Sequence, residues 1–364
     1  MNQLKRPIIK SLREPLGFFF IKMVIFFFCV SFLGCKKEVK PIGLFGKTMG
    51  TTYTVRYFQS GLEGEKPPSE VKTLIDKLLK NINQEMSTYI PDSELSLLNH
   101  SNDSKKWHVL SPRLFKVLKE AENIYQMSDG AFDITVGPLV NLWGFGPNGK
   151  RKIPSESLLN KVKEQVGYHR VEMKTAERKL RRNKGVYLDL SAIAKGFGVD
   201  EVSAFLSKEG LGNHMVEIGG EIKTSGSKRG DPWRLAIETP SQMGQSIHKV
   251  IEVRSLAMAT SGNYRNYFTS GGKFFSHTID PRTSRPVEHF LASVTVFDPV
   301  SCMKADAMAT ALMVMGYEKG LKFAEKNGIL AYFIAGSPMN KRSKGIFVKK
   351  ASTQLKLLLG DHFN

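Results

Sequence analysis

The chain has 364 residues, of which 41% are hydrophobic and 24% are charged. This length provides for one large domain or two ordinary ones with a buried core, and the composition excludes a disordered chain. The formal charge of +19 favours a solvated basic face near acidic lipid over a nucleic-acid-binding module, because the basic residues are scattered, as at 178–182, without interleaved aromatic side chains.

The first 34 residues have the composition of an export signal. Four basic residues precede an apolar run at 16–33, which Lys22 interrupts, and this order is typical of a secretory signal peptide. The run ends in Phe-Leu-Gly-Cys, which resembles the processing site of bacterial lipoproteins and would make a lipidated Cys35 the first mature residue. An uncleaved membrane anchor is the alternative, because the run is nearly long enough to span a bilayer.

These features predict a lipoprotein signal peptide at 1–34, a tether at 35–47 and one domain at 48–364. We expect the mature protein to be lipid-anchored in the cell envelope and to face the periplasm. Removal of the signal deletes five basic and one acidic side chain and lowers the formal charge from +19 to +15. Besides Cys35 the mature chain keeps Cys302 alone, so neither a disulfide framework nor a cysteine metal site is expected.

The first half of the domain mixes strands and helices. Thr, Tyr and Val at 48–57 predict a strand. Three runs of apolar residues at helical spacing each follow a Ser. They predict helices that begin near Ser69, Ser111 and Ser155. A hairpin is expected at 171–190, with its turn at Asn183-Lys184-Gly185.

Two glycine-rich stretches are candidates for ligand contact. The stretch at 130–146 combines glycines with aromatic residues, which suits close approach to a ring, although a loop packed under a helix would have the same composition. The stretch at 189–198 passes from a strand into a helix and lacks the order of a Walker A loop. A helix N-terminus in this place could bind an anion, and Lys195 could meet a phosphate or be an ordinary solvated residue.

The second half is rich in strands. They are predicted at 214–224, 233–238, 250–260, 264–269, 291–297, 329–335 and 345–348, with helices at 306–315 and 317–326. Strands and helices in this mixed order predict an α+β fold with mainly antiparallel sheets flanked by helices.

Two short segments carry candidate chemistry. His277 and Asp280 lie three residues apart on backbone stiffened by prolines, which suits proton transfer beside a charged ligand. Asp306 and Thr310 are four residues apart, so on a helix their oxygens share one face and could seat Mg²⁺ if substrate phosphates complete the coordination. A proline turn followed by a helix with an Asp near its start is the plainer interpretation of both.

Taken in order, seven motifs of the chain resemble those of the ApbE family of FAD:protein FMN transferases. The matching stretches are 48–51, 86–89, 130–133, 189–191 with 195–196, 259–266, 277–281, and 306–307 with Thr310. They cover nearly all of the mature chain. Members of the family are commonly lipoproteins, in agreement with the N-terminal pattern.

The resemblance implies an activity and a set of site residues. FMN would pass from FAD to a Thr or Ser hydroxyl of an acceptor protein through a phosphoester bond, with release of AMP, and the usual acceptor is a subunit of a membrane redox complex. His277 would be the general base, and Mg²⁺ would bind the Asp306 carboxylate, the Thr310 hydroxyl and the Ala192 carbonyl. The positions that would contact FAD are Met49, Tyr89, Ala131, Phe132, Asp133, Asp189, Lys195 and Ile279.

The sequence departs from the family pattern at three positions. Ser284 stands where glycine is usual, Ala309 where some members carry a second carboxylate, and Glu217 where Asn is frequent. Two other functions fit the same residues. One is a Mg²⁺-dependent FAD pyrophosphatase that yields FMN and AMP, and the other is a lipoprotein that binds FAD without chemistry.

Overall fold

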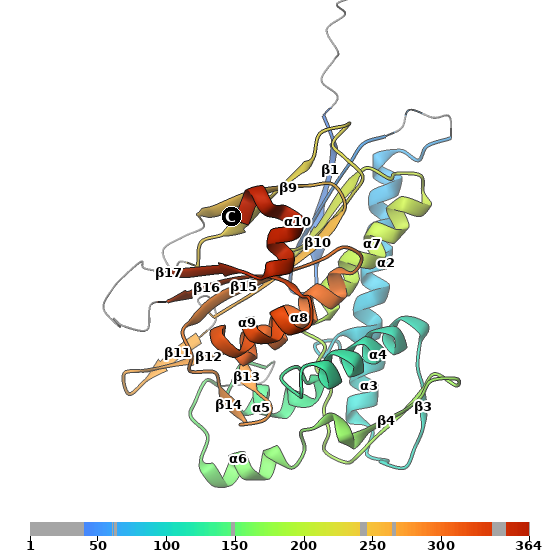
Figure 1. The fold of residues 1–364 in the computed structure, drawn as a ribbon. Helices are drawn as coiled ribbons and strands as arrows, with labels where there is room; N and C mark the ends of the chain where they lie inside the picture. Colours follow the sequence, from blue (N-terminus) through green and yellow to red (C-terminus); the bar gives the residue numbers. More distant parts are fainter. Residues whose placement is uncertain are drawn as a thin grey trace, which may run out of the picture. The chain divides into compact units, whose positions relative to one another are not determined.

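The domain is built on a large antiparallel sheet (Figure 1). A computed structural model describes residues 40–59, 61, 64–146, 150–240, 246–263, 267–336 and 347–363. Within these residues eight strands pair in the order β1-β2-β6-β7-β10-β15-β16-β17. Their bounds are β1 Ile42–Thr48, β2 Thr51–Tyr57, β6 His214–Ile218, β7 Glu221–Ser225, β10 Leu256–Gly262, β15 Leu291–Asp298, β16 Leu330–Gly336 and β17 Phe347–Ala351.

Smaller sheets surround this one. Three are antiparallel hairpins: β8 (Trp233–Glu238) with β9 (Ile247–Val253), β11 (Tyr267–Ser270) with β12 (Lys273–Ser276), and β13 (Ile279–Asp280) with β14 (Arg285–Pro286). The last small sheet has the order β3-β5-β4, with β3 at His108–Val109, β4 at Val171–Lys174 and β5 at Lys179–Arg182.

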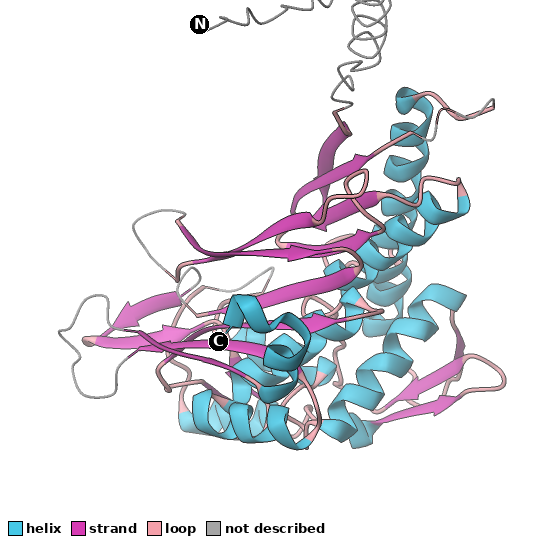
Figure 2. Cartoon of the chain, turned by 45° about the horizontal axis from the view of Figure 1, so that its top comes forward, coloured by secondary structure: helices cyan, strands magenta, loops and turns pink. Residues whose placement is uncertain are grey.

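Most helices pack along one side of the large sheet (Figure 2). Their bounds are α2 Pro68–Met86, α3 Glu94–His100, α4 Pro112–Met127, α5 Gly137–Leu142, α6 Glu156–Lys163, α7 Ala194–Lys208, α8 Cys302–Met315, α9 Tyr317–Lys326 and α10 Thr353–Phe363, with 3-10 turns η1 Ile134–Val136 and η2 Tyr168–Arg170. In the described part of the chain, every helix is too short or too polar to cross a membrane. The α+β fold is as predicted.

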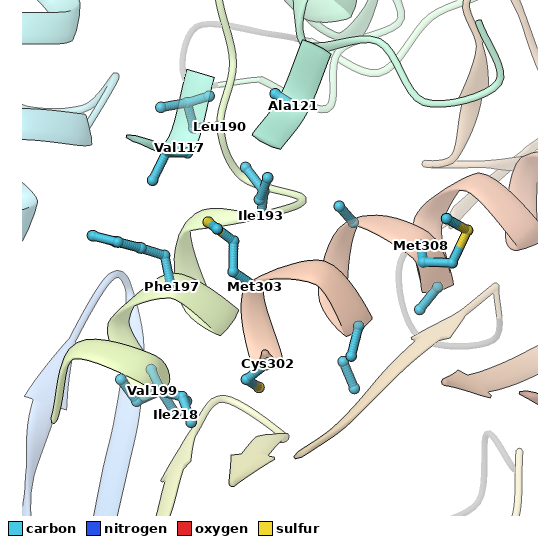
Figure 3. Close-up of a cluster of buried hydrophobic side chains, with 14 of the residues drawn as sticks. Val117, Ala121, Leu190, Ile193, Phe197, Val199, Ile218, Cys302, Met303 and Met308 are labelled. Atoms are coloured by element: carbon cyan, nitrogen blue, oxygen red, sulfur yellow. The ribbon is translucent and has the colours of Figure 1, made fainter. Parts of the chain in front are cut away.

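The main core lies between this helix layer and the sheet. Helix α8 is apolar on nearly all sides and is buried along most of its length, as expected for a helix enclosed by its neighbours. Figure 3 shows side chains of α7 and α8, among them Phe197 and Met303, meeting in this cluster. Each such side chain stabilises the fold by about 1.5–3 kcal/mol when it leaves water.

The opposite face of the sheet is covered as well. Side chains alternate between the two faces of a strand, and in β10 Ala257 and Ala259 join the main core whereas Leu256 and Met258 join a second cluster. The β8–β9 hairpin and α10 cover this face and contribute to the second cluster together with side chains of β15, β16 and β17. Because side chains pack against both faces of the sheet, the strands that lead to the candidate site are held from both sides.

Several boundaries differ from those predicted. Residues 42–47, expected to belong to a tether, form β1 and pair with β2. The turn between β4 and β5 lies at 175–178, where Arg178 adopts a φ of 49°, and not at the Asn-Lys-Gly stretch that follows β5. Helix α8 begins four residues before Asp306, because the Ser301 hydroxyl caps it.

Other elements were missed or divided. Helices α3 and α10 were not predicted from the sequence. The strand expected at 214–224 is a hairpin, β6–β7, because Gly219 and Gly220 both adopt positive φ and turn the chain. The signal peptide, Cys35 and the ends of the strands expected at 264–269 and 345–348 lie outside the described residues.

Candidate active site

One cavity of about 720 Å³ gathers most of the predicted site residues, from segments far apart in the sequence. Its volume lies within the usual range of ligand sites, roughly 300–1,000 Å³. The wall includes Tyr89, Ala131, Phe132, Asp133, Asp189, Ala192, Lys195, His277, Ile279, Asp306 and Thr310. Two predicted residues, Met49 and Asp280, are not part of this wall.

Two of the predicted metal ligands, Asp306 and Thr310, lie on α8, and the third, Ala192, lies in the turn before α7. Asp306 is 4% exposed, and its Oδ2 accepts a hydrogen bond from the Gly196 N–H at 3.0 Å. One turn further along α8, Thr310 Oγ1 lies 3.3 Å from Ser261 Oγ at the end of β10. Among the described residues, no group of three or more His, Cys, Asp or Glu side chains could hold a metal. A cation here would therefore depend on hydroxyl, carbonyl and ligand oxygens in addition to Asp306.

A second buried carboxylate, Glu221 of β7, was not predicted as a site residue. Its Oε2 lies 2.6 Å from Lys195 Nζ, its side chain is 4% exposed, and it lines the cavity. Lys195, for which the sequence left open a phosphate contact or an ordinary solvated position, is thus paired within the protein. In the sequence, the stretch 217–221 was noted only because Glu217 departs from the family pattern, and nothing there marked Glu221 as a site residue.

The pKa values of these three groups depend on one another. Burial and the nearby Asp306 raise the pKa of Glu221. Burial alone would lower the pKa of Lys195, but Asp306 and Glu221 together raise it. Burial also raises the pKa of Asp306, against the opposing effects of Lys195 and the Gly196 N–H. Two buried carboxylates share one ammonium group, so a negative charge on both is unfavourable, and a bound cation would stabilise the doubly ionised form.

His277 stands beside a set of packed aromatic rings. It follows β12 directly, and the Phe145 ring meets it edge-on with 6.3 Å between ring centres. Phe145 packs on Phe268 at 5.7 Å, Phe268 stacks on Phe275 at 4.9 Å, and Phe275 stacks on Trp143 at 5.8 Å. These contacts join the β11–β12 hairpin to the segment that follows α5 and so hold the residues that carry His277.

Asp280, predicted as catalytic with His277, does not line the cavity, and its carboxylate binds within a loop. Its Oδ1 accepts hydrogen bonds from Arg282 N and Nε, both at 2.9 Å, and its Oδ2 accepts one from Arg282 Nη2 at 2.8 Å. Further along this loop, the Ser284 carbonyl accepts a hydrogen bond from Trp143 Nε1 at 3.0 Å. The Asp280 carboxylate is therefore committed to the turn between β13 and β14, because a two-residue spacing lets the guanidinium fold back on it.

The three departures from the family pattern differ in their surroundings. Ser284 adopts a φ of 63°, in the left-handed region that favours glycine. Ala309 is fully buried in the main core and does not line the cavity, so a carboxylate at this position would not point there without rearrangement. Glu217 does line the cavity, and its Oε1 accepts a hydrogen bond from the Gly220 N–H at 2.8 Å.

The loops at 131–135 and 189–191 are joined at the cavity wall. Asp189 N donates to the Ile134 carbonyl at 2.7 Å, and Asp189 Oδ1 accepts from Ser191 N at 2.8 Å. Asp133 is 6% exposed, and its Oδ1 accepts from Thr135 N at 2.8 Å. Both carboxylates thus shape the backbone around the cavity.

Two predicted FAD-contacting residues stand at the edge of this arrangement. Tyr89 lines the cavity and is 66% exposed, so its ring is available at the mouth. Met49 lies in the β1–β2 turn with a φ of 50°, and its side chain packs against Gly198 of α7. Met49 therefore supports the helix that carries Lys195 rather than the cavity wall itself.

Comparison with known proteins identifies the family. Residues 49–333 match the model of the ApbE family. The FAD:protein FMN transferase of Haemophilus influenzae is 43% identical over 338 residues, which cover 90% of this chain and 94% of that protein. The Vibrio cholerae protein of the same name is 46% identical over 300 residues, which cover 81% and 88%.

Solved structures agree with this. The flavin transferase ApbE from Vibrio cholerae superposes with a TM-score of 0.77 at 41% identity, over 87% of this chain and 99% of that one. The apo form of Pseudomonas stutzeri flavinyl transferase ApbE gives a TM-score of 0.78 at 35% identity, over 88% and 97%. The chain described here therefore belongs to the ApbE family.

Proposed function

We propose that this protein is a Mg²⁺-dependent FAD:protein FMN transferase, which moves FMN from FAD to a Thr or Ser hydroxyl of an acceptor protein and releases AMP. Family membership and relatives that carry the name FAD:protein FMN transferase support flavin transfer. The observation that carries the finer proposal is the shared cavity, which His277, Asp306 and Thr310 all line.

The residues of the site suit Mg²⁺. Asp306, the Thr310 hydroxyl and the Ala192 carbonyl would hold it, and these are the oxygen donors that this hard cation prefers. The two buried carboxyl groups beside the single ammonium of Lys195 also favour a cation, which would stabilise them in their ionised form. When bound, the ion would neutralise charge on the diphosphate of FAD.

The chain's own groups account for the rest of the reaction. The acceptor oxygen forms a bond to the phosphorus on the FMN side, the bond from that phosphorus to the AMP oxygen breaks, and His277 takes the hydroxyl proton. An imidazole suits this step because it titrates near neutral pH, and a well-placed general base contributes about 10²–10⁴-fold in rate. The aromatic rings around Phe145 hold the segment of His277 in place.

The site also suggests where substrate groups bind. Apolar residues of the cavity wall, including Phe132, Val136, Phe145 and Ile279, provide a surface for the flavin ring. We further propose that lipidated Cys35 tethers the domain to a membrane of the cell envelope, so that the acceptor is a protein reached from that surface, such as a subunit of a redox complex.

Incubation of the mature protein with FAD, Mg²⁺ and candidate envelope proteins tests this function. Mass spectrometry should reveal an FMN adduct on an acceptor Thr or Ser. The variant His277→Ala should bind FAD but transfer FMN at least about 100-fold more slowly, whereas His100→Ala, at the exposed end of α3, should be unchanged. Release of FMN and AMP without any adduct would establish a hydrolase, and unchanged FAD would establish a binding protein.

A further inference from the structure

The helix that carries the candidate metal ligands begins at a carboxylate from another helix. The first turn of α8 contains no acidic residue. Asp200 of α7 lies there instead, and accepts hydrogen bonds from the N–H groups of Cys302 and Met303, both at 3.0 Å. The first amides of a helix have no partner within it, and a carboxylate beside them also interacts favourably with the helix dipole.

The Asp200 carboxylate is itself fixed by side chains. Its Oδ1 accepts from Lys223 Nζ at 2.7 Å, and its Oδ2 accepts from Ser301 Oγ at 3.0 Å. Lys223 Nζ also donates to the Val300 carbonyl. With the two amides of α8, four donors hold this one side chain, which is 13% exposed. Charged hydrogen bonds of this kind are about twice as strong as neutral ones.

Helix α7 begins in the same way, at a carboxylate from α8. It has no acidic residue in its first turn and no side-chain cap of its own. The N–H of Gly196, in that first turn, donates to Asp306 Oδ2 at 3.0 Å. Gly196 and Asp200 are four residues apart and so share one face of α7. Each helix therefore provides the carboxylate that caps the other.

The two helices also touch at Gly196. A Cβ atom added there would lie 2.8 Å from the Cβ of Asp306 and 2.7 Å from the carbonyl carbon of Cys302. The contact leaves no space for a side chain, so α8 cannot be brought nearer to the start of α7. α8 could still shift lengthwise along α7. The hydrogen bonds from the first two amides of α8 to Asp200 oppose such a shift.

We propose that Asp200 is a positioning residue for the cation seat. By fixing α8 along α7, it sets Asp306 and Thr310 opposite the carbonyl of Ala192. The inference rests on the proposed function, in which these three groups hold Mg²⁺. This ion requires near-ideal octahedral geometry, and residues that orient metal ligands from outside typically change metal affinity by about 10–100-fold when they are replaced.

The test measures cation binding apart from turnover. Mn²⁺ is titrated into the mature protein with FAD and no acceptor, and unbound Mn²⁺ is followed by its electron paramagnetic resonance signal. Asp200→Ala should raise the dissociation constant for Mn²⁺ about tenfold or more. Asp200→Asn, which keeps one acceptor oxygen and the shape of the side chain, should have a smaller effect and serves if the Ala variant folds poorly. Saturating Mg²⁺ should restore FMN transfer in both variants.

Glu325→Ala is the matched control. Its carboxylate accepts a hydrogen bond from the Thr353 N–H at 3.1 Å, at the start of α10, and takes no part in the cavity wall. This variant should lower thermal stability but leave the Mn²⁺ constant unchanged. Wild-type affinity in both Asp200 variants, or equal weakening in Glu325→Ala, would overturn the proposal. A wild-type protein that binds FAD but no Mn²⁺ would overturn the proposed Mg²⁺ dependence, and this inference with it.

Discussion

Replacing Ser284 by glycine should stabilise the protein. Its φ of 63° costs an L-residue about 1–2 kcal/mol. Its hydroxyl is buried without a hydrogen-bond partner among the described residues, which costs about 1–3 kcal/mol. Glycine removes both costs but loses about 0.5–1 kcal/mol through the entropy of the unfolded chain and roughly 0.8 kcal/mol for each buried carbon removed. Taking the lower bound of each gain and of each cost, we expect a net gain of about 0.7 kcal/mol.

Urea denaturation of the mature domain measures this gain as a higher midpoint at unchanged slope. For a domain of this size it corresponds to a rise of about 1–2 °C in Tm. Ser284→Ala separates the two contributions, because it removes the hydroxyl but keeps the backbone strain. We expect Ser284→Ala to lie within about 1 kcal/mol of Ser284→Gly, because the strain that glycine relieves is offset by the chain entropy and the buried carbon that it loses.

Arg229→Gly provides a second comparison, since Arg229 has a φ of 53° on the surface and should gain less. FMN transfer should be unaffected by Ser284→Gly, because the carbonyl that Trp143 Nε1 binds is retained. A Gly variant that is no more stable than wild type, or that differs from the Ala variant by clearly more than about 1 kcal/mol, would refute this reasoning.

Four other predictions follow from the site and its supports. Gly196→Ala should destabilise the fold by about 1–3 kcal/mol through overpacking, whereas Gly212→Ala, with open space around it, should be nearly neutral in urea denaturation. Asp306→Asn should abolish the Mg²⁺ dependence of FMN transfer together with turnover while keeping the near-UV circular dichroism spectrum; normal turnover would place the metal elsewhere. Glu221→Gln should weaken Mn²⁺ binding because it leaves Lys195 to neutralise Asp306, and tighter binding would contradict this. Burial lowers the pKa of His214, so its contribution to stability is complete above about pH 6.5 and declines as the pH falls below that value; His214→Gln should flatten this part of the pH–stability curve relative to wild type.

The sequence was most informative where chemistry depends on local spacing. Asp306 and Thr310 were placed on one helical face by their separation alone, and both line the cavity. Asp280 was assigned to catalysis by the same kind of argument, but its nearest partner, Arg282, lies only two residues away. A short-range cation was therefore the signal that the carboxylate belongs to the loop.

Contacts between distant segments could not be predicted in this way. The pairing of Lys195 with Glu221 depends on how α7 meets β7, and the caps formed by Asp200 and Asp306 depend on how two helices meet. No local pattern marks such residues, because a buried ion pair requires a partner that only the tertiary fold supplies. The edge strand β1 was missed for a similar reason, since its glycine-containing sequence becomes a strand only beside β2.

The shared caps of α7 and α8 have a consequence for the order of folding. Asp306 Oδ2 is bound by Gly196, so the oxygen that remains for a cation is aimed correctly only after two chain segments far apart in the sequence have docked. Contacts of such long range form at a large cost in loop-closure entropy. An affinity for divalent ions should consequently arise late in refolding, after the core has consolidated, and its time course would report when these helices come together.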